Sequence, residues 1–576
     1  MIALCEDPKR QAILNSKKNL LIMGGPGSGK TTIALFKAKQ IVDSGILKDS
    51  QKVLFLSFAR ATISRIEEQA GNLISPHTKG QIEINTYHGF IWNIIRHHGY
   101  LLTDQPIKLL PPHEAPKYIL GIEKNNVKDK FNNLFYENGL IHFDLFAQVC
   151  TQLLTQSCAI RRLVSRMYPI IILDEFQDTN QDEWNLIKLL GEGSRLIVLA
   201  DPNQRIYDFR GADPQRIIQL IDAFSPDIFD FGEENNRSDG TDIAQFGNDL
   251  LSNSNQGKQY QNVDIKTYAF RKKPNTHLAL KFSVLQAIER LKQRQIPDWS
   301  IAVLVPTNAL MLEVSDFLQR KQILTNGRIY PPINHEVAIE TAGPSLAGLF
   351  IAFLLDKGSV QQCTLEEILK MIVDYILGRR GNNPVPKKDL EFVAGIEKYF
   401  STKKVRGKSR EGLLNECRDI SAIVNQTLFS GNIIQDWKSI LGIISQCHSD
   451  YLLCIANDAK YIRLLQRGTQ LYSSLDGIWR RFHTYEGAVN AVSDALTQEH
   501  FAMSTKRWSG VNVMTIHKAK GKEFDEVIIY EGLYHNRIVS KPDRVDQARL
   551  NLRVAVTRAK KHTLILTPVE APCPLL

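Results

Sequence analysis

Short apolar runs, many of them followed by a helical pattern, constrain the fold of this 576-residue chain more than any other feature. Runs such as IIIL and LIVLA are apolar throughout, which is typical of strands that are buried on both faces of a parallel sheet. Buried helical turns are the alternative interpretation, but the short length and β-branched content of the runs favour strands. The predicted strands comprise residues 19–23, 52–58, 81–86, 169–173, 196–200, 300–306, 511–516, 526–530 and 562–567.

The predicted strands form two groups, and long helical segments separate them. These segments show few strand signals, and LEEILKMIVDYIL (365–377), for example, has apolar residues at helical spacing. We therefore predict an α/β fold with two lobes, each carrying a mainly helical insertion. The first lobe is predicted at 1–95 and 161–235 with its insertion at 96–160, and the second at 236–340 and 505–576 with its insertion at 341–504.

The composition excludes several classes of protein. Hydrophobic residues make up 43% and charged residues 23% of the chain, so neither wholesale disorder nor a collagen-like structure is expected. The longest apolar stretch, 346–355, is about half as long as a membrane span, and Glu6 and Asp7 stand where a signal peptide needs apolar residues. The eight cysteines lack paired spacing, which argues against a disulfide framework and against a zinc or iron–sulfur site. We expect a cytoplasmic protein with no membrane partner.

The chain is basic, with 71 Lys and Arg residues against 61 Asp and Glu residues and a formal net charge of +10. This charge is compatible with a polyanionic partner but does not establish one. The most basic tract is KKVRGKSR at 403–410. It is interpreted as a solvated loop, and a contact with duplex phosphates is the alternative.

The segment GGPGSGKT (24–31) has the pattern of a phosphate-binding loop and stands between a predicted strand and a predicted helix. Glycines let backbone N–H groups encircle phosphates because they carry no Cβ, and the helix N-terminus adds favourable partial charge. Lys30 is expected to reach the β- and γ-phosphates of ATP, and the Thr31 hydroxyl to ligate Mg²⁺. A glycine turn with a purely structural role is the alternative. The predicted ATP-binding residues of this segment are Gly24, Gly25, Pro26, Gly27, Ser28, Gly29, Lys30, Thr31 and Thr32.

A second acidic element, PIIILDEFQDTN (169–180), places two carboxylates at the end of an apolar strand. This is the edge at which α/β sheets bind ligands, and successive residues point to opposite sides, so the two acids can have different roles. Asp174 is expected to hold Mg²⁺, and Glu175 to orient and deprotonate the attacking water. Two adjacent buried acids are unfavourable without a cation, which argues against a structural role. Capping of the following helix is left open for Gln177 and Asp178.

The chain resembles superfamily 1 DNA helicases of the UvrD/Rep/PcrA type in six segments that follow that family's order. These segments are GGPGSGKT, ILDEFQDTN, ADPNQRIYDFRGAD, ENNRS, MTIHKAKGKEF and VAVTRAKK. INTYHGF (84–90) is similar to a further motif of the family, and SIAVLVPTNALMLEVSDFL to its second-lobe strand and helix. The resemblance extends from about residue 8 to residue 568 and implies that both lobes are RecA-like, parallel-sheet P-loop lobes.

For the nucleotide, the resemblance implies further site residues. Gln204 in ADPNQR would sense the γ-phosphate, and Glu523 in KGKEF would contact the ribose. Arg237 in ENNRS and Arg558 in VTRAK resemble two arginine fingers, for which a surface salt bridge is the alternative. DPKRQAIL resembles the adenine-reading motif with a spacing that is ambiguous by one residue, and it suggests Gln11 as the base reader.

For DNA, the resemblance implies aromatic side chains on which bases stack, a mode of binding that does not depend on sequence. Phe58, Tyr207 and Phe209 match such positions. Core packing at a strand end is the alternative for Phe58. Phosphate or backbone contacts along the strand are implied for Thr86, His88, Arg210 and His517.

The chain departs from the family's pattern at several places. The loop after Phe58 reads ARATI in place of Thr-Asn-Lys-Ala-Ala, and Ala200-Asp201-Pro202-Asn203 replaces the usual Gly-Asp pair before the Gln of the third motif. Asn236 replaces the Tyr of Asn-Tyr-Arg-Ser, and Lys522 replaces a Leu.

The resemblance implies an ATP-driven DNA helicase and translocase that moves 3′ to 5′ on single-stranded DNA in repair, recombination or defence, at junctions of single-stranded and duplex DNA. The alternative is a DNA-sensing ATPase subunit, for example of an anti-phage complex, that does not unwind duplex. A protein partner, such as a nuclease or a repair or defence subunit, is included in this prediction. A helicase–nuclease is disfavoured because the chain ends soon after the last motif, and a metabolic P-loop kinase because it would not need the TRAK and KGKEF segments.

Overall fold

The computed structural model divides the chain into two compact units. The first unit consists of Met1–Ile95, Ala147–Ile339 and Met503–Leu576, and the second of Arg96–Phe146 and Glu340–Ala502. The structure describes residues 7–576 apart from 49, 59–77, 79, 112–113, 120–121, 123–125, 205–212, 233, 270–275, 324–326, 328, 338–341, 381–384, 461–469, 502–507 and 540–543.

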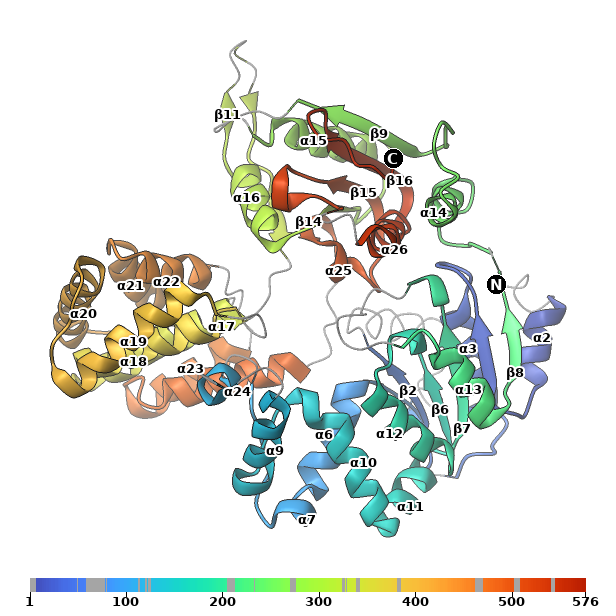
Figure 1. Ribbon diagram of the computed structural model, residues 1–576, viewed down its shortest axis with the longest axis horizontal. Coiled ribbons are helices and arrows are strands. Elements are labelled where there is room, and N and C mark those ends of the chain that lie inside the picture. The colour runs from blue at the N-terminus through green and yellow to red at the C-terminus, as the bar shows by residue number, and fades with distance from the viewer. Residues whose placement is uncertain are drawn as a thin grey trace. The chain divides into compact units, whose positions relative to one another are not determined.

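Two six-stranded sheets form the framework of the first unit (Figure 1). The first sheet has the order β3-β2-β6-β7-β1-β8, and the second β13-β14-β10-β15-β16-β9. Every strand pair within them is parallel, as predicted for buried apolar runs. The strands of the first sheet are β1 (Leu20–Met23), β2 (Val53–Ser57), β3 (Ile82–Thr86), β6 (Ile170–Leu173), β7 (Arg195–Ala200) and β8 (Asp227–Asp230). Those of the second are β9 (Val263–Tyr268), β10 (Ser300–Val305), β13 (His335–Val337), β14 (Gly510–Thr515), β15 (Phe524–Tyr530) and β16 (Ala559–Pro568).

Helices cover the sheets because alternate strand residues point to opposite faces. In β10, Ala302 and Leu304 pack in one core with α14 and α26, whereas Ile301 and Val303 pack in the other with α15 and α16. In the first sheet, α3 buries an apolar face against β1, β2 and β6. The main helices of this unit are α2 (Pro8–Asn15), α3 (Lys30–Asp43), α6 (Tyr87–His98), α10 (Phe146–Gln156), α11 (Cys158–Met167), α12 (Gln181–Gly191), α13 (Arg216–Phe224), α14 (Ile243–Ser252), α15 (Leu278–Gln293), α16 (Asn308–Gln319), α25 (Ile516–Ala519) and α26 (Val545–Val556).

The second unit is mainly helical, as expected for the insertions, and most of its helices share one hydrophobic core. The helices from its first segment are α7 (Tyr100–Thr103), α8 (Ala115–Ile119) and α9 (Val127–Asn138). Those from its second segment are α17 (Ala342–Ser359), α18 (Leu365–Gly378), α19 (Lys387–Thr402), α20 (Lys408–Gln426), α21 (Ile433–Ser445), α22 (Asp450–Lys460), α23 (Gln470–Phe482) and α24 (Ala488–Phe501).

One predicted boundary differs from the structure. We predicted that the first insertion ends at residue 160, a position that lies inside α11, whereas the compact units divide between Phe146 and Ala147. The end of α11 is tied to the first sheet, because the Met167 carbonyl accepts a hydrogen bond from the Lys52 N–H at 2.8 Å. A helical pattern alone does not reveal which neighbour a helix packs against, so it does not locate this boundary.

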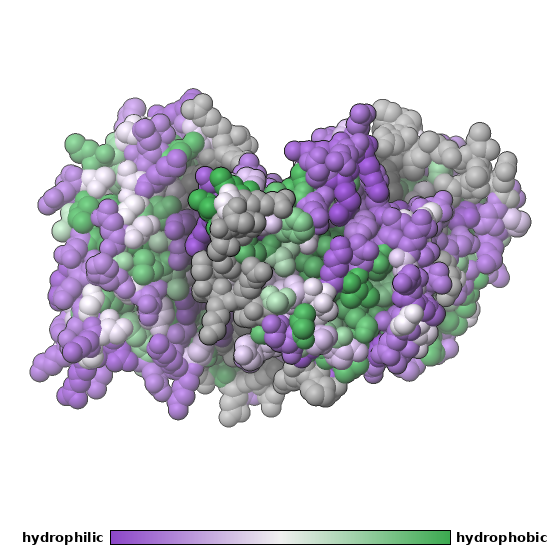
Figure 2. All heavy atoms as spheres, turned by 90° about the horizontal axis from the view of Figure 1, so that it is seen from above, coloured by the Kyte–Doolittle hydropathy of each residue, from purple (hydrophilic) through white to green (hydrophobic). Residues whose placement is uncertain are grey.

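No helix among the described residues is long and apolar enough to cross a membrane. Hydrophilic side chains predominate on the coloured surface in Figure 2, and hydrophobic ones occur between them in smaller patches.

Candidate functional site

The segment 24–31 links β1 to α3 and forms a turn that requires glycine. Gly27 and Gly29 have φ angles of 81° and 91°, in the left-handed region that side chains rarely adopt. A Cβ on Gly27 would lie only 2.5 Å from Asn235 Oδ1. The Asn236 N–H donates to the Gly27 carbonyl at 2.8 Å, so the loop also meets a segment of the second lobe there.

The Lys30 ammonium lies within this turn. Its Nζ donates to the carbonyls of Gly24 and Gly25 at 2.6 and 3.0 Å. Burial lowers the pKa of Lys30, and the carboxylates of Asp201, Glu175 and Asp174 oppose that effect. A cation that has already lost its water shell is suited to bind phosphate oxygens.

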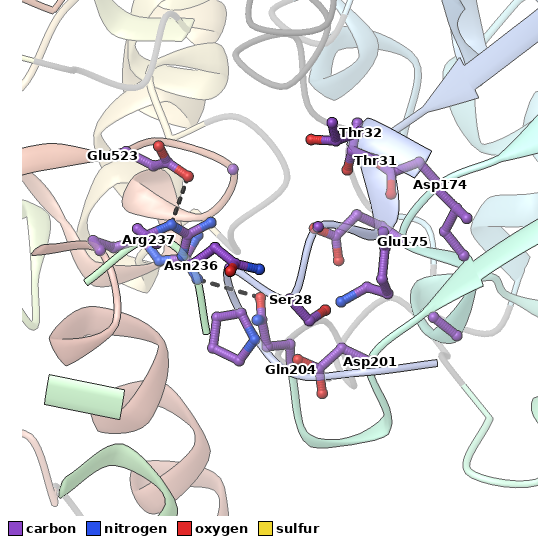
Figure 3. A pocket seen from close by; sticks show the side chains of 18 of the residues that line it. Ser28, Thr31, Thr32, Asp174, Glu175, Asp201, Gln204, Asn236, Arg237 and Glu523 are labelled. Carbon is purple, nitrogen blue, oxygen red and sulfur yellow. Dashed lines mark hydrogen bonds and ion pairs between the residues drawn. The ribbon is translucent and has the colours of Figure 1, made fainter. Parts of the chain in front are cut away.

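A cavity of about 330 Å³ opens at this loop, and both lobes line it (Figure 3). The contributions of the first lobe follow β1, β6 and β7, which are neighbours in the sheet, so their carboxyl ends meet. Two of the segments from the second lobe directly precede β15 and β16. The lining residues are Pro26, Gly27, Ser28, Gly29, Lys30, Thr31, Thr32, Asp174, Glu175, Gln177, Leu199, Ala200, Asp201, Gln204, Asn236, Arg237, Gly521, Glu523, Arg558 and Lys560.

The adjacent acids Asp174 and Glu175 differ in protonation. Burial, and then the charge of Glu175, raises the pKa of Asp174 to about 7, although the Ser57 hydroxyl donates to Asp174 Oδ2 at 3.2 Å. Burial would also raise the pKa of Glu175, but Lys520, Lys30 and Arg558 outweigh it and hold that pKa below its usual value. Glu175 is therefore the ionised member of the pair.

Glu175 is held in an unusual backbone conformation, with a φ angle of 55°. Its Oε2 accepts a hydrogen bond of 2.6 Å from Gln177 Nε2, and Gln177 Oε1 accepts one of 3.0 Å from the Asp201 N–H. Gln177 thus joins the segments after β6 and β7. A non-glycine residue in the left-handed region at a cavity indicates a site where orientation matters more than backbone energy.

Lys520 is a buried cation that sequence reasoning did not assign to the site. Its Nζ donates to the carboxylate of Asp178. The same Nζ donates to the Gln204 carbonyl at 2.8 Å and lies 3.5 Å from Glu175 Oε2. Its position in the family segment HKAKGKEF is the sequence feature that could have indicated a role in the site. The helix-capping interpretation of Gln177 and Asp178 is wrong, because Asn180 caps α12 and the other two side chains serve the site.

Arg237 and Arg558 reach the cavity from the second lobe. Arg237 Nε donates to Glu523 Oε1 at 2.5 Å, and Arg237 Nη1 donates to the Thr557 carbonyl at 2.9 Å. Figure 3 shows Arg237 and Glu523 on the side of the cavity opposite Thr31 and Asp174. Arg558 is 2% exposed, and its Nη2 donates to Gln204 Oε1 at 3.3 Å. The structure therefore brings both predicted arginine fingers to the cavity that contains Lys30.

Gln11 does not line this cavity. It lies exposed on α2. The preceding residue, Arg10, instead pairs with Asp7 and Glu234 at 2.8 and 2.6 Å and lies over the Phe231 ring. The role of Gln11 as the base reader stays a prediction.

The residues predicted to bind DNA are only partly described. Tyr207, Phe209 and Arg210 lie outside the described residues. Phe58 follows β2 and stacks on Tyr87, with ring centroids 4.1 Å apart, so it packs against a neighbouring ring at the strand end.

The remaining predicted DNA contacts lie near strand ends. Thr86 ends β3 and accepts a hydrogen bond from the Gly89 N–H at 2.8 Å, and His88 follows in α6. His517 lies in α25, directly after β14, and burial lowers its pKa. These residues follow strand carboxyl ends, where ligands of α/β proteins bind.

The side chains around Asp174 fit an Mg²⁺ ion that is bound together with phosphates. Among the described residues no group of three or more His, Cys, Asp and Glu side chains could hold a metal ion. Mg²⁺ usually binds through one or two carboxylates, with phosphate oxygens and water as its other ligands. Thr31 and the buried Asp174 line the cavity and supply oxygens of this kind.

Comparison with known proteins gives the same assignment across the chain. Residues 5–132 and 121–225 match the UvrD/REP helicase N-terminal domain, and residues 401–570 match the UvrD-like helicase C-terminal domain. A probable DNA helicase II homolog of Mycoplasma pneumoniae is 22% identical over 97% of this chain and 83% of its own length. The putative ATP-dependent DNA helicase YjcD of Bacillus subtilis is 20% identical over 97% of this chain and 78% of its length. The ATP-dependent DNA helicase PcrA of Staphylococcus aureus is 24% identical over 43% of this chain and 40% of its length.

The family models match residues 5–225 and 401–570, which together are more than half of the chain. The resemblance read from the sequence is thereby confirmed: the chain belongs to the family of UvrD/REP helicases.

Proposed function

We propose that this chain is an ATP-dependent DNA helicase that moves 3′ to 5′ on single-stranded DNA. One observation carries the proposal: the cavity at the P-loop has Lys30, Asp174 and Glu175 on one lobe and Arg237 and Arg558 on the other. A triphosphate in this cavity would be held from both lobes at once. Its hydrolysis would release that grip, so that the lobes move relative to each other.

The residues have distinct roles in hydrolysis. Lys30, Arg237 and Arg558 would stabilise the negative charge on the transferring phosphoryl group, and Glu175, which is ionised, would accept a proton from the attacking water. Gln204 would report on the γ-phosphate, because it touches Arg558 directly. Mg²⁺, held by Asp174 and Thr31, would neutralise phosphate charge when bound.

The proposed movement requires binding of single-stranded DNA and of its junctions with duplex. Phe58 would offer an aromatic face for a base, and Thr86, His88 and His517 would contact the strand. The polarity, a role in repair, recombination or defence, a cytoplasmic location and a protein partner remain predictions from the family resemblance.

The test is a strand-displacement assay on duplexes with a 3′ tail, a 5′ tail or no tail, run beside ATP hydrolysis with and without single-stranded DNA. The proposal expects DNA-stimulated hydrolysis and displacement that requires the 3′ tail. Displacement only from a 5′ tail would overturn the polarity. Stimulated hydrolysis without displacement would instead support a DNA-sensing regulatory ATPase.

A further inference from the structure

Arg553 is a buried arginine that no motif assigned to a function. It lies on α26, five positions before Arg558, and is 2% exposed. Its Nη1 crosses to the first lobe, donates to the Asn203 carbonyl at 3.1 Å and lies 3.8 Å from Asp201 Oδ2. Its Nη2 donates to Asn248 Oδ1, in its own lobe, at 3.2 Å. The guanidinium therefore joins the two lobes.

Close packing of α14 against α26 holds this guanidinium in place. A Cβ on Gly247 would lie 3.0 Å from Thr557 Cγ2 and 3.4 Å from Arg553 Cγ, so any larger residue would require these side chains to shift by a few tenths of an ångström. Asn248 follows Gly247 and supplies the oxygen that accepts from Arg553. The planar fork of arginine suits such a site, because it can hold several acceptors in a fixed geometry.

The contact falls on η4 (Pro202–Gln204), the turn that carries Gln204. Lys520 donates to the Gln204 carbonyl at 2.8 Å and Arg558 to Gln204 Oε1 at 3.3 Å. Three cations of the second lobe thus hold one turn of the first lobe.

Arg553 differs from Arg558 in its location. It does not line the nucleotide cavity, but it lines a second cavity, of about 560 Å³, on the Gly24–Pro26 side of the P-loop. The two cavities share Pro26 and Asp201 in their linings. Arg553 therefore acts on the turn without reaching the nucleotide itself.

We propose that Arg553 is a positioning residue that fixes η4 to the second lobe, so that Gln204 meets the γ-phosphate. The inference rests on the proposed function and deepens it. Arg553 acts through the Asn203 carbonyl and the Asp201 carboxylate.

The test compares Arg553→Gln with Arg549→Gln in the full chain. Arg549 lies one turn away on α26 and donates to Leu250 O and Asn253 Oδ1, both in its own lobe, at 2.9 and 2.8 Å. Because a misplacement of about 1 Å can cost about hundredfold in rate, we expect Arg553→Gln to lower the DNA-stimulated kcat by about tenfold or more. KM for ATP should stay within about threefold, since ground-state contacts remain. Arg549→Gln should stay within about twofold of the parent chain in both constants.

Two further variants separate positioning from folding. Arg553→Lys keeps the charge but not the fork, so its kcat should lie between those of the parent chain and Arg553→Gln. Asn248→Ala removes one acceptor of the guanidinium and should lower kcat in the same direction by a smaller factor. A kcat of Arg553→Gln equal to that of Arg549→Gln, or a loss confined to KM, would overturn the inference. If a thermal melt shows that Arg553→Gln does not fold, the kcat of Asn248→Ala tests the positioning role instead. A kcat of Asn248→Ala equal to that of the parent chain would then overturn the inference.

Failure of the proposed function gives a different result. If the parent chain hydrolyses ATP without stimulation by DNA, the helicase proposal is wrong. The changes in kcat and KM of Arg553→Gln still test the positioning role in that case. A parent chain without any ATP hydrolysis overturns both.

Discussion

Asp174 and Glu175 show how two neighbouring acids acquire different chemistry from their surroundings. Burial and the charge of Glu175 raise the pKa of Asp174 to about 7, whereas Lys520, Lys30 and Arg558 overcome the effect of burial and lower the pKa of Glu175. Protons therefore compete with a metal ion for the carboxylate of Asp174, whereas Glu175 stays ionised near neutral pH.

The raised pKa of Asp174 predicts that Mg²⁺-dependent nucleotide binding weakens in acid. A carboxyl must lose its proton to ligate Mg²⁺, so the apparent Mg²⁺ affinity should fall by about tenfold between pH 8 and pH 6. The measurement is calorimetric titration of ADP binding against Mg²⁺ across this range. Asp174→Asn is the control, because it retains the pH dependence of the nucleotide alone. An identical pH dependence in both proteins would contradict the assignment.

Lys520 predicts an effect on both stability and rate. It is 3% exposed and pairs with the buried Asp178, and removing one partner of a buried ion pair costs about 3–5 kcal/mol. Lys520→Met should lower the free energy of unfolding by about that amount in a denaturant titration. Because Lys520 also lowers the pKa of Glu175, the acid limb of the pH–rate profile should move to higher pH. Lys518→Met is the matched control, and equal stability of the two variants would refute the ion-pair role.

At the scale of elements, the connection between β6 and α12 contains residues that cap the helix and other residues that serve the site. Asn180 Oδ1 accepts from the Glu183 N–H at 2.9 Å, and Glu183 Oε2 accepts from the Asn180 N–H at 2.9 Å, which forms a capping box. The helix start is thus satisfied locally. Gln177 and Asp178, in η3 (Phe176–Asp178), remain available for long-range partners.

The capping box predicts a purely structural effect for Asn180. Asn180→Ala should lower the free energy of unfolding by about 1 kcal/mol, while the affinity for ADP stays unchanged. Asn180→Ser retains a capping oxygen and should recover most of the loss. Denaturant titration and nucleotide binding measure the two quantities, and a weakened affinity in Asn180→Ala would show that the box also shapes the site.

Three strands of the two six-stranded sheets that are not predicted from the sequence share one property. β8, β9 and β13 are all edge strands of their sheets. β8 reads DIFD with Ile228 47% exposed, and in β9 the four central residues are exposed. An edge strand lacks a neighbour on one side and need not be apolar on both faces, so these three strands lack the continuous apolar run that predicts the central strands.

At the scale of the whole molecule, function depends on one cavity lined from two lobes. Arg558 is buried there beside Gln204, and Glu175 lies on the other lobe. Arg558→Ala should lower ATP turnover by about 10³–10⁵-fold, because a transition-state contact is lost, and reduce nucleotide affinity much less. Single-turnover hydrolysis and ADP binding measure the two effects. Arg558→Lys should recover only part of the rate. Hydrolysis of ATP by Arg558→Ala at the rate of the parent chain would refute the proposal that both lobes bind the nucleotide.

The sequence by itself determined what depends on neighbours along the chain. The glycines of 24–31 specify a turn that no other residue adopts easily, and the apolar run before Asp174 specifies a buried strand that ends in acids. These signals are local, and they predicted the P-loop, the acidic pair and the central strands.

Only the tertiary structure decided which charges meet. Lys520 reaches Asp178 across 342 positions of sequence, and Arg553 reaches Asn203 across 350. Such pairs leave no periodic or compositional trace, because a buried cation is selected by the groups that folding places beside it. The same reason explains Gln11, whose motif position did not bring it to the cavity: proximity to a ligand depends on the packing of whole elements.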